Sequence, residues 1–281
     1  MAVIENLPET TKVETTKVET AEAETNTPAQ VPSLLPQRLT NVAVPVCTAI
    51  VLLLVWQFGV RFFEVPTYIA PAPTDVGAVL REDFPLLMRN FWPTFTVSVV
   101  GFFAGNIAAI LIAVTFVHSR AMERAFFPMA VFVNTIPILA IAPILVLIFG
   151  PGFTAKVMIA GLICFFPTLV NMVRGLQAVS PQTLELARIL SASKSEVFWK
   201  IRLPSSLPFL FSALKIAATT CVIGAIVSEW IGADVGLGAL IIDSTFNYRS
   251  PLLYATVFMS SGLSVLLFVS VTITEKLVVR W

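Results

Sequence analysis

The stretch ELARILSASKSEVFWKIRLP, residues Glu185–Pro204, is the one long polar interval in the second half of an otherwise apolar chain. The hydrophobic segments Val157–Val173 and Leu207–Ile231 flank it, and each is long enough to cross a bilayer. A polar interval of this length is more than a simple turn between two such segments. It predicts a folded unit at the membrane surface, within a polar loop at residues 174–206, where a soluble protein is expected to dock.

The first part of this polar loop has the pattern of a short helix. Ser180 followed by Pro181 is typical of an N-cap with a proline in the first turn, and Leu184, Ala187 and Leu190 recur at helical spacing. A Ser-Ala-Ser sequence then interrupts the pattern. The loop is therefore expected to contain one short helix that begins after Ser180.

A second short helix is predicted to follow in the same loop. Ser193 and Glu196 have the spacing of a capping box, in which each residue satisfies a backbone donor at the start of the helix. Val197 and Phe198 would belong to its apolar side. We expect Pro204 to end this helix.

The composition identifies the protein class. Of 281 residues, 57% are hydrophobic and 12% are charged, and the mean hydropathy is +0.87, whereas a soluble domain needs roughly a quarter of its residues charged. The sequence therefore predicts an integral membrane protein with six transmembrane helices. The six hydrophobic spans are Val42–Val60, Phe91–Val117, Ala125–Phe149, Val157–Val173, Leu207–Ile231 and Leu252–Thr274.

The basic residues predict the orientation of these spans. Six spans place both termini on one side, and that side would carry 12 of the 18 Lys and Arg residues if it is the inner one, against 5 on the outer side. The termini and the polar loop are therefore predicted to be cytoplasmic. Residues 1–40 hold six glutamates and no aromatic residue, so we expect a disordered cytoplasmic tail before a transmembrane domain at 41–281.

The third span is unusual because it contains Pro128, Pro137 and Pro143. Each proline removes a backbone donor, which a bilayer tolerates only next to protein or a water-filled cavity. Asn134 and Thr135, just before the second proline, are therefore candidates for lining a translocation pathway. Hydrogen bonding between helices, without substrate contact, is the alternative.

The fifth span contributes the other pathway candidates. Thr219 and Thr220 lie in its interior, Glu229 lies near its outer end, and Lys215 near the cytoplasmic end is expected to snorkel to the interface. Glu229 has two interpretations, a pathway or gate residue and a carboxylate that snorkels to the outer interface. The glycine-rich GADVGLGAL segment after it is predicted to re-enter at the surface.

Small residues in the second span have a structural interpretation. Gly101, Gly105 and Ala109 recur every four residues on one face, a pattern that lets helices approach closely.

Elsewhere the sequence lacks the residues of a catalytic or cofactor site. His118 is the only histidine, the three cysteines share no metal-ligand spacing, and no lysine follows a glycine as a phosphate-binding loop requires. We expect no metal, no bound cofactor and no nucleic acid.

The polar loop resembles the cytoplasmic loop of permease subunits of bacterial ABC importers. That loop has the pattern E-A-A, three residues, G, nine residues, I-x-L-P. The matching residues here are Glu185, Ala187, Ile201, Leu203 and Pro204. Leu186 replaces the second motif residue and Ser191 stands where the family usually has glycine, so the turn between the two short helices is expected to differ in detail. The runs Asn134–Gly150 and Ser228–Ile241 resemble the sulfonate, taurine, nitrate and pyrimidine-precursor branch.

The resemblance implies a type I ABC importer permease fold in the bacterial plasma (inner) membrane, with a pair of short cytoplasmic coupling helices. It implies a pathway formed by two copies of this chain or by this chain and a paralogue. Two cytoplasmic ATPases, which hold ATP and Mg, would dock on the motif residues Glu185, Ala187, Ser191, Ile201, Leu203 and Pro204. An extracytoplasmic binding protein would deliver the substrate. On this basis the chain itself is not an enzyme.

A secondary transporter or channel subunit that works without ATP is the alternative function. Coupling to an ion gradient needs ionisable residues inside the membrane, and the sequence offers only Glu229 and Lys215, both near the ends of a span. This favours the ABC permease. Its substrate stays open among sulfonates, taurine, nitrate, bicarbonate, and pyrimidine or flavin precursors.

Overall fold

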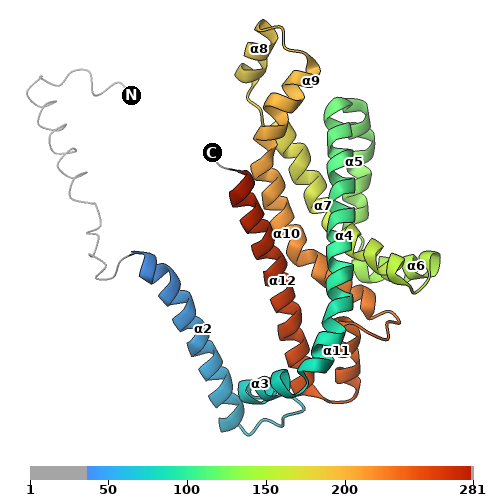
Figure 1. Cartoon of the computed structure of the whole chain (residues 1–281). Helices are drawn as coiled ribbons and strands as arrows, with labels where there is room; N and C mark the ends of the chain where they lie inside the picture. Colours follow the sequence, from blue (N-terminus) through green and yellow to red (C-terminus); the bar gives the residue numbers. More distant parts are fainter. Residues whose placement is uncertain (1–36, 280–281) are drawn as a thin grey trace, which may run out of the picture. The chain divides into compact units, whose positions relative to one another are not determined.

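The structure is a computed structural model that describes residues 37–279 (Figure 1). The chain divides into two units after Val55. In the first unit the described residues belong to helix α2 (Gln37–Phe62), and residues 44–55 are all exposed. Because α2 begins at Gln37, the predicted tail boundary at residue 40 falls inside a helix. The rest of the predicted tail lies outside the described residues.

The second unit is helical throughout its described residues, apart from short connecting turns (Figure 1). Its elements after the end of α2 are α3 (Pro73–Glu82), α4 (Phe84–His118), α5 (Arg120–Thr135), α6 (Ile138–Phe149), α7 (Phe153–Gln177), α8 (Pro181–Ile189), α9 (Lys194–Val197), a π-helix (Phe198–Arg202), α10 (Leu203–Glu229), α11 (Leu237–Phe246) and α12 (Ser250–Val278).

Five helices of the described chain are long and apolar enough to cross a membrane, and the number is six if α5 and α6 form one bent span. The prediction of a single helix for the third span is wrong, because α5 and α6 meet at an angle of 102°. The chain breaks before Pro137, which has no backbone donor and which holds Ile136 in an extended conformation. Pro128 and Pro143 lie inside α5 and α6 without ending them.

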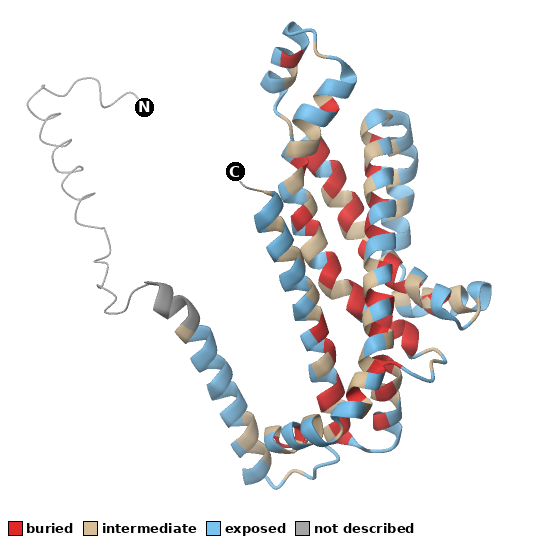
Figure 2. Ribbon diagram, in the orientation of Figure 1, coloured by how far each residue is buried: buried red, intermediate tan, exposed pale blue. Residues whose placement is uncertain are grey.

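The core of the second unit lies between α4, α7 and α10, and Figure 2 shows the buried residues gathered on these helices. The predicted small-residue stripe is confirmed, because Gly101 and Gly105 face Gly161 of α7 at close range. A Cβ atom at Gly105 would overlap the carbonyl oxygen of Gly161. Ala109, the third member, is fully buried in the same interface. By contrast, α5 has no buried residue.

Candidate functional site

The first short helix of the polar loop is α8, and it begins as predicted. Ser180 Oγ accepts a hydrogen bond of 3.2 Å from the backbone N–H of Thr183, which makes Ser180 the N-cap, and Pro181 occupies the first turn. Both interactions depend only on residues that are close in sequence, because an N-cap satisfies donors within its own first turn. This explains why the sequence pattern was sufficient.

The turn after α8 depends on the unusual backbone of Ser191. Its φ is +52°, in the left-handed region that favours glycine. Two hydrogen bonds close the turn, from Ser191 N–H to the Arg188 carbonyl (3.0 Å) and from Ala192 N–H to the Ala187 carbonyl (2.9 Å). This is the Schellman arrangement. Ser191 therefore adopts a backbone conformation that favours glycine, at the position where the motif that it resembles usually has glycine.

The predicted capping box at the start of α9 is confirmed. Ser193 Oγ accepts from the Glu196 N–H at 3.2 Å, and the Ser193 N–H donates to Glu196 Oε2 at 3.0 Å. Lys200 Nζ lies 3.2 Å from Glu196 Oε1. The hydrogen bonds from the backbone and side chain of Ser193, together with the Lys200 ammonium, lower the pKa of the exposed Glu196 carboxyl to about 2.

The prediction that Pro204 ends the second helix is wrong. The chain stays helical from Lys194 to Glu229, because α9 continues through the π-helix into α10. The Leu203 N–H bonds to the Phe198 carbonyl, five residues back, and Pro204 follows in the first turn of α10. Proline lacks a backbone N–H, and the helix does not need that donor in the first turn of α10, so Pro204 does not interrupt it. The polar loop is thus joined to α10 without a break.

The α8 side chains point in directions that the sequence pattern did not distinguish. Leu184 is half-buried and Ala187 is only 5% exposed, so these two residues face the rest of the chain. Leu190, expected on the same stripe, is 71% exposed, and it forms a separate outward face with Leu186 (57%) and Ile189 (79%). We call these three residues the α8 outer face. The i, i+3, i+4 spacing of these three residues was visible in the sequence. The face that they form lies beside the stripe that contains Leu184 and Ala187.

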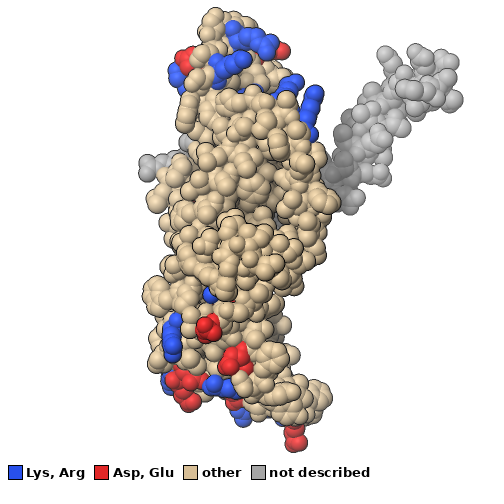
Figure 3. Space-filling view, turned by 90° about the vertical axis from the view of Figure 1, so that its right-hand side faces the viewer, with Lys and Arg blue, Asp and Glu red and all other residues tan. Residues whose placement is uncertain are grey.

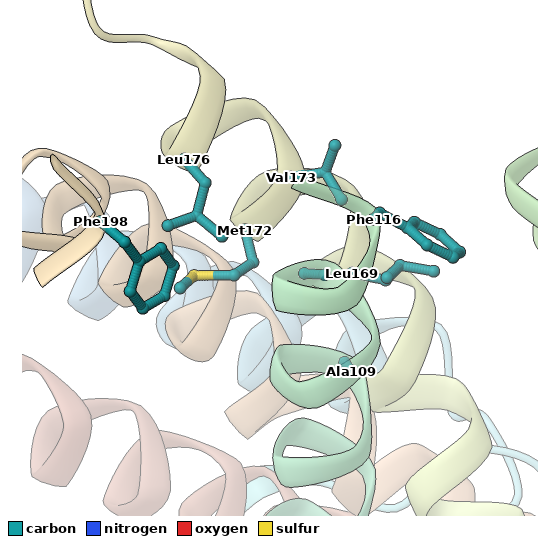
Figure 4. Packing of buried hydrophobic residues seen from close by; sticks show 8 residues of the cluster. Ala109, Phe116, Leu169, Met172, Val173, Leu176 and Phe198 are labelled. Atoms are coloured by element: carbon teal, nitrogen blue, oxygen red, sulfur yellow. The ribbon is translucent and has the colours of Figure 1, made fainter. Parts of the chain in front are cut away.

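Phe198 ties the polar loop to the core. Figure 4 shows its ring directed toward Met172 and Leu176 of α7, and the ring centroid of His118, at the end of α4, lies 5.0 Å away. Arg202 Nη1 donates to the Leu176 carbonyl at 2.9 Å. The loop is therefore held on the ends of α4 and α7, while the α8 outer face is left uncovered by the described chain.

The candidate pathway residues Asn134 and Thr135 lie at the end of α5, where the chain bends into α6. Both line a cavity of about 470 Å³ between α4, α5, α6 and α7. No charged side chain lines this cavity, and four phenylalanines do: Phe116, Phe126, Phe165 and Phe166. Thr219 and Thr220 bond to carbonyls of their own helix and, like Glu229, do not line it. The structure therefore does not bring the five candidates together.

The side chain of Glu229, at the end of α10, accepts hydrogen bonds from residues of other helices. Its side chain is buried (1% exposed), so the alternative in which it snorkels to the interface is wrong. The Thr94 hydroxyl of α4 donates to Glu229 Oε1 at 2.8 Å, and the Gly238 N–H at the start of α11 donates to Oε2 at 2.8 Å. A buried carboxylate is stable only when such donors satisfy it.

The segment between α10 and α11 is held by the same residues. The Leu237 N–H donates to Thr94 Oγ1 at 2.8 Å, and the Gly236 N–H donates to Asn90 Oδ1 at 2.9 Å. With the Gly238 bond, three successive backbone donors at the start of α11 are satisfied by side chains of α4 and α10. We call Asn90, Thr94 and Glu229 the α11 cap. The segment was predicted to re-enter at the surface; in the structure the start of α11, at residues 236–238, is buried.

Lys215 also has a partner that the sequence did not indicate. Its Nζ lies 2.5 Å from Glu275 Oε2 of α12, and both side chains are about a quarter exposed (26% and 23%). The sequence predicted that Lys215 snorkels to the interface, and the structure adds an ion pair that this prediction did not include. Sixty residues of sequence separate the two, so only the packing of α10 against α12 reveals the pair.

Comparisons with known proteins agree with this architecture. The family described as binding-protein-dependent transport system inner membrane component matches residues 101–280. The chain is 31% identical to the formylaminopyrimidine transport permease protein ThiX of Halalkalibacterium halodurans, over 84% of this chain and 95% of that one. It is 31% identical to the riboflavin transport system permease protein RibX of Chloroflexus aurantiacus, over 83% and 88%.

A more distant relative is the putative aliphatic sulfonates transport permease protein SsuC of Bacillus subtilis, 23% identical over 82% of this chain and 84% of that one. Among solved structures, an amino acid ABC transporter with histidines matches with a TM-score of 0.58 and 20% identity, over 71% of this chain and 97% of that chain. This likeness supports the helical fold. The chain belongs to the family of inner membrane components of binding-protein-dependent transport systems, and it is a permease subunit of an ABC importer.

Proposed function

We propose that this permease subunit receives the work of ATP hydrolysis through the α8 outer face, on which a cytoplasmic ATPase subunit docks. The observation that carries the proposal is the exposure of Leu186, Ile189 and Leu190, three large apolar side chains on one face of a short helix. The face cannot lie in hydrocarbon, because α8 stands in a polar loop with Arg188 and Lys194 close by. A soluble protein with an apolar groove is the partner that such a face fits.

The motif residues have different proposed roles around this face. Glu185 is exposed beside it and is proposed to meet a basic group of the ATPase. Ala187 is buried in this chain, so it lets α8 pack closely on its own loop instead of entering a groove of the partner. Ser191 sets the turn between the short helices. Ile201, Leu203 and Pro204 join the loop to α10.

The unbroken helix from Lys194 to Glu229 supports a mechanism for transmitting motion. Its 36 residues extend about 54 Å at the rise of an α-helix. Because the polar loop is at one end and the α11 cap is at the other, a tilt imposed by the ATPase would move both ends together. We propose that α10 links ATPase docking to the opposite membrane surface. In this orientation the termini and the polar loop are cytoplasmic, as the basic residues predict.

Docking is tested with Ile189→Asp, which places a charge in the α8 outer face. We expect the affinity for the ATPase to fall at least tenfold, because centrally placed interface residues often contribute about 2 kcal/mol or more. The permease should keep its thermal unfolding temperature, since Ile189 is exposed. Ser195→Asp is the matched control, since it adds the same charge to an exposed position in α9. Undiminished ATPase affinity in Ile189→Asp contradicts the assignment.

The remaining partners follow from the family and from the unburied helices. We propose that a second permease subunit, identical or paralogous, packs against α5, because that helix has no buried residue yet exposes Met129 and Phe132. ATP and Mg are proposed to bind only to the ATPase subunits, and an extracytoplasmic binding protein is proposed to deliver the substrate. Chemical cross-linking between cysteines introduced at Met129 of two copies tests the homodimer. A cross-link found only with a different permease subunit indicates a paralogue.

We further propose that the cavity at the bend between α5 and α6 is part of the translocation pathway. Asn134 and Thr135 supply its polar groups. Asn134→Leu keeps the number of side-chain heavy atoms and the branching at Cγ but removes the amide, so we expect slower uptake with unchanged assembly. Normal uptake at normal expression would exclude a pathway role, and an equal loss of uptake and assembly would indicate a packing role.

The proposed substrate is a conjugated heterocycle of the pyrimidine or flavin type. Two relatives that are 31% identical are named for formylaminopyrimidine and riboflavin, whereas the named sulfonate, nitrate and bicarbonate relatives are 23–26% identical. The aromatic lining of the cavity, which lacks any charged side chain, also suits an uncharged ring better than a small anion. Uptake of labelled riboflavin and aminopyrimidines, compared with nitrate, tests this choice.

A further inference from the structure

Two adjoining cavities lie beneath the polar loop, where it rests on the ends of α4, α5 and α7. One has a volume of about 710 Å³ and the other of about 410 Å³. Val117, Leu184 and Arg202 line both, so the cavities share a wall. Neither cavity belongs to the pathway site described above, whose lining residues are different. We call the pair the loop cavities.

The charges that line the loop cavities are almost all positive. Five Lys and Arg side chains take part: Arg120, Arg124, Arg188, Lys194 and Arg202. Glu123 is the one carboxylate in either lining, and its Oε1 already accepts a hydrogen bond of 2.9 Å from Gln177. Within residues 37–279, no ion pair neutralises any of the five cations. Figure 3 shows Lys and Arg gathered at this end of the second unit, above a wide band without charges.

The positive-inside rule accounts for the presence of basic residues on this side of the membrane. It does not explain why side chains from separate elements gather around the same cavities. Four of the five come from three separate elements, the start of α5, the end of α8 and the start of α9, and Arg202 comes from the π-helix. Cations that served only to orient the chain would gain by spreading apart, because like charges repel. Their arrangement around shared concavities is typical of a site for a polyvalent anion.

We propose that the loop cavities bind a phosphate-bearing anion. Arginine guanidinium groups suit this ligand, because each presents a planar pair of donors that matches two phosphate oxygens. Arg202 already uses Nη1 to bond the Leu176 carbonyl, which fixes its position at the wall between the cavities. A phosphate placed there would connect α5 to α8 and the π-helix. It would therefore stiffen the polar loop against the helix bundle.

The phosphate can come from an anionic phospholipid headgroup or from a soluble phosphate ester. Location on the cytoplasmic side rests on the proposed orientation of the chain, whereas binding itself does not. A direct binding measurement on the full chain in neutral detergent therefore tests the site independently of transport. The probes are short-chain phosphatidylglycerol, short-chain phosphatidylcholine and inorganic phosphate. Binding is measured by native mass spectrometry and calorimetry.

The informative variant is the double substitution Arg120→Gln/Arg124→Gln, because both side chains are exposed and neither makes a hydrogen bond or ion pair with another residue between 37 and 279. Wild-type protein should bind phosphatidylglycerol more tightly than phosphatidylcholine. The double variant should lose about tenfold or more in phosphatidylglycerol affinity, since each basic residue near an anionic headgroup contributes about fivefold. The control Arg174→Gln/Lys276→Gln removes two exposed cations that line neither cavity, and it should change affinity less than about twofold.

The outcomes separate the two sources. Inorganic phosphate that displaces phosphatidylglycerol at similar concentration supports a soluble ester, and phosphatidylglycerol binding that resists phosphate supports a lipid headgroup. Equal loss in the control variant, equal binding of phosphatidylcholine, or no binding by wild-type protein would overturn the proposal. Loss of probe binding when the ATPase is added would also overturn the proposal, because the basic surface would then belong to the interface with that partner.

Discussion

The α11 cap and the polar loop solve the same problem by different means. In both places the chain leaves one helix, turns and starts another, so the first backbone donors of the new helix need partners. In the polar loop, Ser180 and Ser193 satisfy donors three residues away. In the α11 cap, Asn90 and Thr94 satisfy donors 146 and 143 residues away. One helix start is therefore local, and the other requires the assembled bundle.

This difference predicts how damage spreads. A change in the α11 cap should affect the whole bundle, because α4, α10 and α11 share its hydrogen bonds. A change in a polar-loop cap should affect only a few residues around it, while the α8 outer face stays free for a partner. The four predictions that follow test this contrast, beginning with the largest expected effect.

Gly238→Ala should be the most damaging of these four substitutions. An added methyl group at the start of α11 would overlap the Ile226 carbonyl oxygen and press on Glu229, and neither the backbone nor a fully bonded carboxylate can yield easily. We expect a loss of about 3 kcal/mol or more. Thermal unfolding in detergent measures it. Gly262→Ala is the control, because α12 leaves open space there, and equal unfolding temperatures for the two variants would contradict a tight cap.

Thr94→Val should have the next largest effect. Valine has the shape of threonine but removes the bond to Glu229 and the acceptor for the Leu237 N–H, so we expect a loss of about 1–3 kcal/mol. Thr94→Ser should restore most of it. The control is Thr96→Val, two residues along α4, where the hydroxyl is exposed and bonds only to its own helix. If both valine variants unfold alike, the α11 cap does not hold the bundle together.

Ser193→Ala should have a smaller and local effect. It removes the N-cap of α9, which typically costs about 1 kcal/mol. Amide hydrogen exchange should increase in residues 193–198, while the thermal unfolding temperature stays that of the parent. Ser195→Ala, at an exposed position of the same short helix, serves as the comparison. A fall in global stability comparable to that of Thr94→Val would show that damage to this cap does not stay local.

Ser191→Gly should have the smallest effect, and a favourable one. Glycine adopts the left-handed conformation of φ +52° without the strain that a side chain brings, so we expect a gain of roughly 0.5 kcal/mol in local stability. Slower exchange of the Ala192 amide, which bonds to the Ala187 carbonyl, measures it. Faster exchange would mean that the serine side chain contributes to the turn.

The candidate site divides in the same way between what could and could not be predicted. The helix starts of α8 and α9 were predictable from Ser180 and Ser193, because their partners lie within one turn. The outward direction of Ile189 was not, since two apolar stripes run side by side along α8 and only packing decides which one is covered. Pro137 predicted a disturbed third span, but not a bend of 102°.

What the sequence determined by itself is everything that depends on neighbours along the chain: the apolar spans, the short capped helices of the polar loop, and the small-residue face of α4 that includes Gly105. Tertiary structure alone decided the partners of Glu229 and Lys215. Glu229 looked like a residue at the end of a span, yet it is enclosed by Thr94 and Gly238. The physical reason is that a buried charge must find donors wherever the fold brings them, and sequence spacing does not record that meeting.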